Sequence, residues 1–339
     1  MRIAIDAMGG DHGPPAVIPA AVAALRKHAN LHVVLVGDEA ILTKALSAEQ
    51  GVVPSTRVSI RHATQQVEMD ESPSQALRTK KDSSMRVAID LVKEGEADAC
   101  VSAGNTGALM AKARFVLKML PGIDRPAICC ALPAIQGHSH VLDLGANLDS
   151  SPEQLLQFAL MGAALTSAVD NKPAPSVALL NVGEEEIKGD GRVKEAAMLI
   201  SQSNLNYVGF AEGDAVFKGS VDVIVCDGFV GNIALKASEG VGRMFLHFAK
   251  EEFLRTPLTR LAAWVSGPVL KAAVRRIDPR RYNGASLLGL RGIVIKSHGS
   301  ADQVSFAYAI DEAVLEVEKR VPDLISKDLE LIFDQRRAV

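Results

Sequence analysis

Short apolar runs alternate with longer amphipathic stretches along almost the whole 339-residue chain. Runs of β-branched and aliphatic residues separated by stretches of about 10–15 residues with helical spacing are typical of βαβ units. Right-handed crossovers between such strands place helices on both faces of a mostly parallel sheet. The pattern therefore predicts an α/β fold, a three-layer α/β/α sandwich.

The pattern changes after Gly231, because residues 233–282 show helical spacing and no strand pattern. We expect residues 1–339 to form a single α/β/α unit, with 233–282 as a helical excursion within it. The expected strands are 2–7, 32–37, 57–62, 97–102, 127–132, 140–144, 177–182, 207–211, 221–226 and 292–296. The expected helices include 16–28, 84–94, 106–120, 152–169 and 193–202.

Composition excludes several classes of protein. Hydrophobic residues make up 48% of the chain, which excludes extensive disorder, and a net charge of −3 gives no argument for a nucleic-acid partner. The N-terminus has a strand pattern and not that of a signal peptide, and no apolar run approaches the roughly 18 residues that span a bilayer. We therefore expect a cytoplasmic protein. Four cysteines in apolar runs, without CxxC spacing, are expected in the core as thiols: Cys100, Cys129, Cys130 and Cys226.

Four loops of small and polar residues follow expected strands, at residues 9–14, 102–107, 144–147 and 227–232. Each alone is typical of a tight turn between a strand and a helix. At the carboxyl ends of one parallel sheet, however, such loops and the helix N-termini after them form anion sites. The four together favour a shared cleft for phosphate.

Known nucleotide, hydrolase and metal motifs do not occur. The chain has no GxGxxG, GxxxxGK[ST], GxSxG or HExxH sequence. His138 and His140, with Asp143 beyond them, have a spacing that can bind metal, but histidines at a strand edge are usually solvated. These residues therefore give no argument for a nucleotide cofactor and little for a metal.

Two charged segments accompany the loops. Residues 79–84 combine Lys80 and Lys81 with a serine that can cap a helix, which suits a phosphate. Residues 183–189 place Lys188 among three glutamates, a pattern that more often marks a solvated loop.

A basic amphipathic stretch covers residues 255–281, where Asp278 is the only acid. Such a stretch can lie on an anionic membrane, meet an acidic partner, or pack in a dimer interface. Gly267 and Pro268 predict a division into two short helices. The residues expected to contact a membrane or partner are Leu258, Leu261, Trp264, Val265, Lys271, Arg275 and Arg276.

Motifs spread over the chain in one order resemble a known family. They are DAMGGD at 6–11, ALRTKKDSSM at 76–85, SAGNTG at 102–107, NVGEEEIKG at 181–189, DGFVGN at 227–232 and SHG at 297–299. Together they resemble the bacterial phosphate acyltransferases, which convert acyl-acyl-carrier-protein to acyl-phosphate at the start of phospholipid synthesis.

The resemblance implies a fold like that of isocitrate and isopropylmalate dehydrogenases and of phosphotransacetylase. It also implies that no metal or nucleotide cofactor is needed, and that the protein is a homodimer that associates peripherally with the membrane. The expected reaction is reversible transfer of a long-chain acyl group from acyl carrier protein to inorganic phosphate. The product would pass to a membrane glycerol-3-phosphate acyltransferase.

In this reaction phosphate attacks the thioester carbonyl, so positioning and charge stabilisation dominate. Asn147 or Asn232 is the expected oxyanion donor, and Lys188 would neutralise the leaving thiolate. Asp6, Asp11 or Asp227 would orient donors or accept a proton. The expected phosphate-binding residues are Gly9, Gly10, Asp11, Lys80, Lys81, Ser102, Gly104, Asn105, Thr106 and Gly107.

Four alternatives remain from the residues alone. No serine or cysteine has an evident base beside it, which favours direct transfer, with Ser102 as the least unlikely nucleophile. A phosphotransacetylase acting on acyl-coenzyme A would use the same loops. A decarboxylating dehydrogenase of the same fold and a non-catalytic membrane scaffold are the other two.

Overall fold

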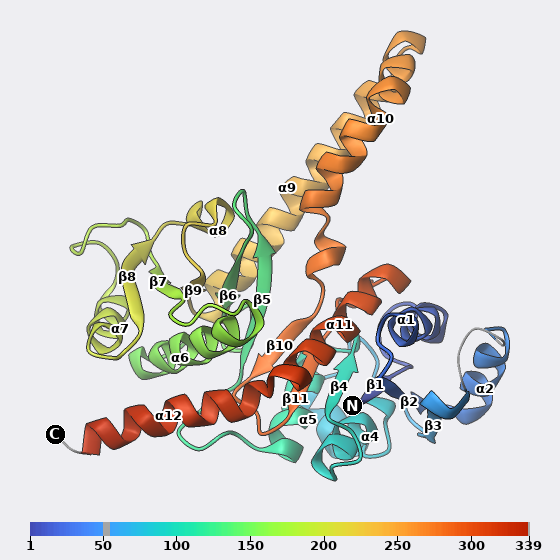
Figure 1. The fold of residues 1–339 in the computed structure, drawn as a ribbon, viewed down its shortest axis with the longest axis horizontal. Coiled ribbons are helices and arrows are strands. Elements are labelled where there is room, and N and C mark those ends of the chain that lie inside the picture. The colour runs from blue at the N-terminus through green and yellow to red at the C-terminus, as the bar shows by residue number, and fades with distance from the viewer. Residues whose placement is uncertain (50–54, 338–339) are drawn as a thin grey trace.

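One mixed β-sheet forms the centre of the protein (Figure 1). The computed structural model describes residues 1–49 and 55–337, and in these residues the strands form one sheet of order β3-β2-β1-β4-β11-β10-β5-β6-β9-β7-β8. The strands are β1 Arg2–Asp6, β2 His32–Gly37, β3 Val58–His62, β4 Ala99–Ser102, β5 Ala127–Pro133, β6 His138–Leu142, β7 Ser176–Leu180, β8 Asn206–Ala211, β9 Val223–Val225, β10 Ala285–Leu288 and β11 Ile293–Lys296.

The sheet has two halves that run in opposite directions. The strands β3, β2, β1, β4 and β11 are parallel neighbours, and so are β6, β9, β7 and β8. Between these groups, three successive antiparallel pairings join β11 to β10, β10 to β5, and β5 to β6. Because three is an odd number, the strands of the second group run antiparallel to those of the first. The carboxyl ends of the two groups therefore lie at opposite edges of the sheet.

Helices cover both faces, which confirms the predicted three-layer arrangement. On one face, the apolar sides of α1 and α11 pack over the first half and those of α6, α7 and α12 over the second. On the other face, α3, α4, α5 and α8 form the second apolar layer. These helices are α1 Pro14–Lys27, α3 Pro73–Thr79, α4 Ser84–Lys93, α5 Thr106–Leu117, α6 Pro152–Val169, α7 Gly191–Ser201, α8 Ala215–Lys218, α11 Gln303–Lys319 and α12 Val321–Arg337; α2 Glu39–Ser47 lies beside β2 and β3.

The region 233–282 forms a helical hairpin that projects from the body (Figure 1). Its helices are α9, Gly228–Leu254, and α10, Pro257–Ile277. The predicted division at Gly267 and Pro268 is wrong, because α10 runs through both residues. Proline removes one backbone N–H, so α10 passes Pro268 with one hydrogen bond fewer while it packs along α9. None of the helices in the described residues is both long and apolar enough to cross a membrane.

Candidate active site

Three loops meet backbone to backbone at the carboxyl ends of β1, β4 and β11. A side chain on Gly9 would place its Cβ 2.9 Å from the Gly104 nitrogen, and Gly10 has φ +86 with a Cβ position 2.9 Å from the Gly299 oxygen. The Asp11 N–H donates to the same Gly299 oxygen over 2.8 Å. Only glycine permits these approaches, so the GG pair joins the loop after β1 to the loops after β4 and β11.

Asp6 lies beneath these loops and is 1% exposed. Ser102 Oγ donates to Asp6 Oδ2 over 2.6 Å and accepts from the Gly104 N–H at 3.0 Å. Burial raises the pKa of Asp6, while hydrogen bonds from Ser102 and Ser84 act in the opposite direction. Within the described residues Asp6 Oδ1 has no hydrogen-bond partner. This geometry gives Asp6 and Ser102 a part in orienting the loops.

The N-terminus of α5 faces the same edge of the sheet. Asn105 caps α5 by accepting the Ala108 N–H at 3.0 Å, and its amide donates to the carbonyls of Met69 at 2.8 Å and Glu71 at 2.9 Å. The Asn105 side chain is therefore used in the loop itself. The N–H groups of Thr106 and Gly107, in the first turn of α5, have no partner inside the helix and carry its positive dipole end.

Cations surround this edge, and three of them were not predicted from the sequence. Lys296, 8% exposed, donates to the carbonyls of Ala103, at 3.3 Å, and Ser297; burial lowers the pKa of Lys296 to about 8. Lys236 of α9 lies 3.5 Å from His298 Nε2. The buried Lys112 donates to the Lys80 carbonyl at 2.8 Å.

Lys112 also donates to the Ala76 carbonyl at 2.7 Å, and burial lowers its pKa to about 8. It therefore holds the end of α3, where Lys80 is the C-cap residue. Lys80 itself is half-buried and Lys81 is exposed. A lysine in an otherwise apolar stretch was the available signal for both Lys112 and Lys296, because a charge in the core needs a partner.

The other predicted residues follow β6, β7 and β9, at the opposite edge of the sheet. The expectation that all four loops lie at one edge of the sheet is therefore wrong. It could not have been corrected from the sequence, because hydrophobic patterns do not encode strand direction. Asn147, an expected oxyanion donor, is held within the loop after β6. It is 5% exposed, and its amide donates to the carbonyl of Pro126 and to Asp143 Oδ2, each at 2.9 Å. No amide hydrogen remains for an oxyanion.

Asp227, Asn232 and Lys188 differ in their surroundings. Asp227 caps α9 by accepting the Val230 N–H at 2.9 Å, and its other oxygen lies 3.3 Å from Arg192. It therefore orients the first turn of α9. Asn232 is exposed, and the Lys188 side chain, 47% exposed, lies 3.9 Å from Glu185. Both Asn232 and Lys188 remain accessible to a ligand.

The helix α9 connects the two groups of loops. It begins at the carboxyl end of β9 and carries Asn232 and Lys236 one turn apart, a rise of about 6 Å. Since Lys236 contacts His298 in the loop after β11, α9 extends from the second group to the first. The candidate site therefore combines N–H groups and cations near β1, β4 and β11 with Asn232 on α9.

Among the described residues, the site offers donors and cations but no activated nucleophile. Ser102 is fully buried and its hydroxyl is already bonded to Asp6. Burial raises the pKa of all four cysteines, that of Cys130 to about 12, so they remain thiols. Such a site can bind an anion and stabilise a developing oxyanion.

Comparisons with known proteins agree with this chemistry. Residues 1–324 match the family described as "Fatty acid synthesis protein". A phosphate acyltransferase of Nitrosococcus oceani is 62% identical over 330 residues, 97% of each chain. One of Methylococcus capsulatus is 60% identical over 334 residues, 98% of each chain.

Solved structures share the fold at much lower identity. A phosphotransacetylase from Streptococcus pyogenes has a TM-score of 0.65 at 16% identity, over 94% of both chains. A 4-hydroxythreonine-4-phosphate dehydrogenase from Klebsiella pneumoniae has a TM-score of 0.53 at 17% identity, over 93% of this chain and 98% of its own. These similarities confirm the predicted fold class.

Proposed function

This chain belongs to the phosphate acyltransferase family, and we propose that it transfers a long-chain fatty acyl group reversibly from acyl-acyl-carrier-protein to inorganic phosphate. The acyl-phosphate would then serve glycerophospholipid synthesis. The observation that carries the proposal is the joining of three loops through Gly9 and Gly10, beside buried Lys296 and the N–H groups in the first turn of α5. This is an arrangement for a small, doubly charged anion.

In the proposed mechanism the protein holds phosphate against the thioester carbonyl. The N–H groups of Thr106 and Gly107, with Lys80 and Lys81, bind phosphate at the N-terminus of α5. One phosphate oxygen forms a bond to the carbonyl carbon, giving a tetrahedral oxyanion that the Asn232 amide stabilises. The carbon–sulfur bond then breaks, and the electron pair leaves with the pantetheine thiolate, whose charge Lys188 neutralises.

Acidic residues have indirect roles in this mechanism. A carboxylate beside phosphate would repel it, and the positions of Asp6 and Asp227 in hydrogen bonds and caps suit orientation instead. Asp11, whose N–H holds the Gly299 carbonyl, orients the loop after β1 in the same way. Positioning of this kind raises the reaction rate effectively when it holds the nucleophile within reach of the carbonyl carbon.

The projecting hairpin is the proposed contact surface. Along α9 its exposed apolar side chains include Phe245 and Phe248, which suit the same surface of a second copy in a homodimer. On α10, Leu258 is 79% and Trp264 is 78% exposed, near basic residues that suit an anionic membrane. The remaining members of this α10 surface are Leu261, Val265, Lys271, Arg275 and Arg276, all exposed.

A cytoplasmic enzyme that binds the membrane peripherally would deliver its product directly. Acyl-phosphate is reactive toward water, so a membrane glycerol-3-phosphate acyltransferase is the fitting recipient. Nucleic acid and cofactors have no part in the proposal. We expect the carrier protein to be acidic, and it would meet the cationic side chains of Lys188 and Arg192.

Release of free thiol tests the proposal. The protein is mixed with palmitoyl-acyl-carrier-protein, or with palmitoyl-coenzyme A, in the presence and absence of phosphate. We expect release that requires phosphate and is faster with the carrier protein. Equal or faster release from the coenzyme A thioester would indicate a phosphotransacetylase. Release without phosphate would indicate a thioesterase, and binding to vesicles without any release would indicate a scaffold.

A further inference from the structure

Two histidines and an aspartate meet outside the acyl-transfer site. His138 and His140 are two residues apart on β6, so both side chains point to the same face of the sheet. Asp170, the C-cap residue of α6, reaches them: its Oδ2 lies 3.0 Å from His138 Nε2 and 3.8 Å from His140 Nδ1. The sequence suggested Asp143 as the third group. The structure instead uses Asp143 to accept N–H groups of its own loop.

We propose that His138, His140 and Asp170 form a binding site for a divalent transition-metal ion, with Zn²⁺ as the preferred occupant. One ligand atom from each residue lies within 4.8 Å of the others. Zinc binds imidazole nitrogen and carboxylate oxygen at about 2.0–2.2 Å, which separates tetrahedral ligand atoms by roughly 3.3 Å. The observed separations of 3.0 and 3.8 Å bracket that value, so small side-chain rotations complete the site.

The charge around the three residues favours a cation. Asp222 interacts electrostatically with His140, and Glu312 of α11 interacts with both Asp170 and His138. Lys172 pairs with Asp222, and Lys319 donates to Asn171, the residue after Asp170. Three acidic residues, Asp170, Asp222 and Glu312, therefore lie around the histidines. Hard ions such as Mg²⁺ prefer all-oxygen ligands, so the two imidazoles select a transition metal.

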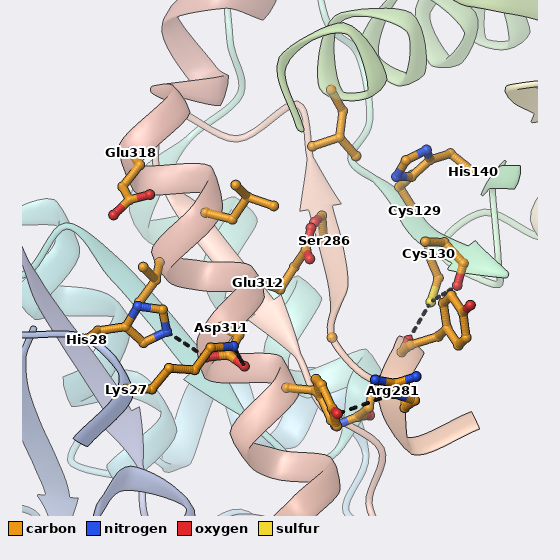
Figure 2. Close-up of a pocket in the computed structure, with 18 residues that line it drawn as sticks. Lys27, His28, Cys129, Cys130, His140, Arg281, Ser286, Asp311, Glu312 and Glu318 are labelled. Atoms are coloured by element: carbon orange, nitrogen blue, oxygen red, sulfur yellow. Dashed lines mark hydrogen bonds and ion pairs between the residues drawn. The ribbon is translucent and has the colours of Figure 1, made fainter. Parts of the chain in front are cut away.

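The site is accessible to a metal ion and has a position for water. The His138 side chain is 32% exposed and that of Asp170 is 19% exposed. His140 and Glu312 line a cavity of about 340 Å³ between β5, β10 and α11 (Figure 2). Thr166 Oγ1 lies 3.1 Å from His140 Nδ1, so the Thr166 side chain would have to turn about χ1 to give this nitrogen to the metal. Three protein ligands leave a fourth tetrahedral position open.

A bound metal would tie the end of α6 to β6. Because α6 packs against β6 and β9 in the second half of the sheet, occupancy should stabilise that half without entering the acyl-transfer site. The variants His138→Gln and Asp170→Asn remove ligands on the partly exposed side. The exposed His32, at the start of β2, provides a matched control as His32→Gln.

Cobalt binding tests the site directly. The full-length chain, without a histidine tag and freed of metal by a chelator, is titrated with Co²⁺, and Zn²⁺ is then added as a competitor. We expect one equivalent of Co²⁺ with the visible absorption of a tetrahedral complex, displaced by Zn²⁺. His138→Gln and Asp170→Asn should each weaken binding at least tenfold, since loss of even an outer-shell partner costs about 10–100-fold. His32→Gln should bind as the parent does.

Thermal unfolding gives a second, independent measurement. Zinc should raise the unfolding midpoint of the parent and of His32→Gln, but not that of His138→Gln, and acyl transfer by all three should be equal without metal. The proposal is overturned if Co²⁺ does not bind stoichiometrically. It is also overturned if the ligand variants bind Co²⁺ as tightly as the parent. If His138→Gln does not fold, Asp170→Asn decides by the same two measurements, because that change preserves side-chain shape.

Discussion

Replacing Ser102 with alanine tests whether Ser102 positions the loops or acts as the nucleophile. The hydroxyl donates to the buried carboxylate of Asp6 over 2.6 Å and accepts the Gly104 N–H at 3.0 Å. A hydrogen bond to a charged group contributes about 1.5–3 kcal/mol, and a buried N–H left without a partner costs about 1–3 kcal/mol. We therefore expect Ser102→Ala to lower the free energy of unfolding by roughly 3 kcal/mol.

The same change should affect phosphate binding more than chemistry. Without Ser102 Oγ, the loop after β4 loses its connection to Asp6, and the N–H groups at the start of α5 are less well placed. We expect about a tenfold rise in the KM for phosphate and a measurable kcat. Urea unfolding and steady-state thiol release provide the two measurements. Ser139→Ala is the matched control, since Ser139 is equally buried and donates to the Val221 carbonyl at 2.8 Å.

A nucleophilic Ser102 would give the opposite result. Ser102→Ala would then abolish acyl transfer while changing stability no more than Ser139→Ala does. An acyl adduct on Ser102, trapped during turnover and identified by mass spectrometry, would refute the positioning role outright.

Three further results should follow. Gly10→Ala, at φ +86 in the packed loops, should lower the free energy of unfolding by about 1–3 kcal/mol and raise the KM for phosphate. The control Gly95→Ala, at φ +74 with open space around it, should show only the smaller backbone strain. Urea unfolding and steady-state kinetics measure both effects. Because burial lowers the pKa of Lys296 to about 8, its positive charge is lost as pH rises through 8, and the KM for phosphate should rise in that range. Lys296→Arg should remove that rise, because arginine keeps its charge. Asn232→Ala should lower kcat by about 10²–10³ at unchanged stability, whereas Asn147→Ala should lower the free energy of unfolding by about 1–3 kcal/mol.

Apolar periodicity predicted the elements but not the direction of the sheet. The expected strands overlap the observed ones because strands such as β4 are buried along their whole length and consist mostly of apolar residues. The short β10 escaped detection, since its four residues, ASLL, have no clear alternation. That strand and the hairpin of β5 and β6 reverse the second half of the sheet. Long-range pairing of this kind leaves no local pattern in the sequence.

The candidate site could be predicted only in part. Gly9, Gly10 and Ser102 stand out because glycines and a serine between a strand and a helix suggest an anion loop. Asn147 carries the same signal, yet its amide is used by Asp143 and Pro126, and only coordinates show which hydrogen bonds an amide makes. Lys296 was missed because a lysine at the end of a strand usually extends into solvent.

Transfer of isotope from phosphate tests the central claim most directly. The protein is mixed with acyl-acyl-carrier-protein and phosphate carrying ¹⁸O in all four positions, in a single turnover, and the products are analysed by mass spectrometry. Direct attack by phosphate predicts acyl-phosphate that keeps all four labelled oxygens, with thiol released at the same rate. Release of unlabelled fatty acid, or of thiol at an equal rate without phosphate, would contradict the account.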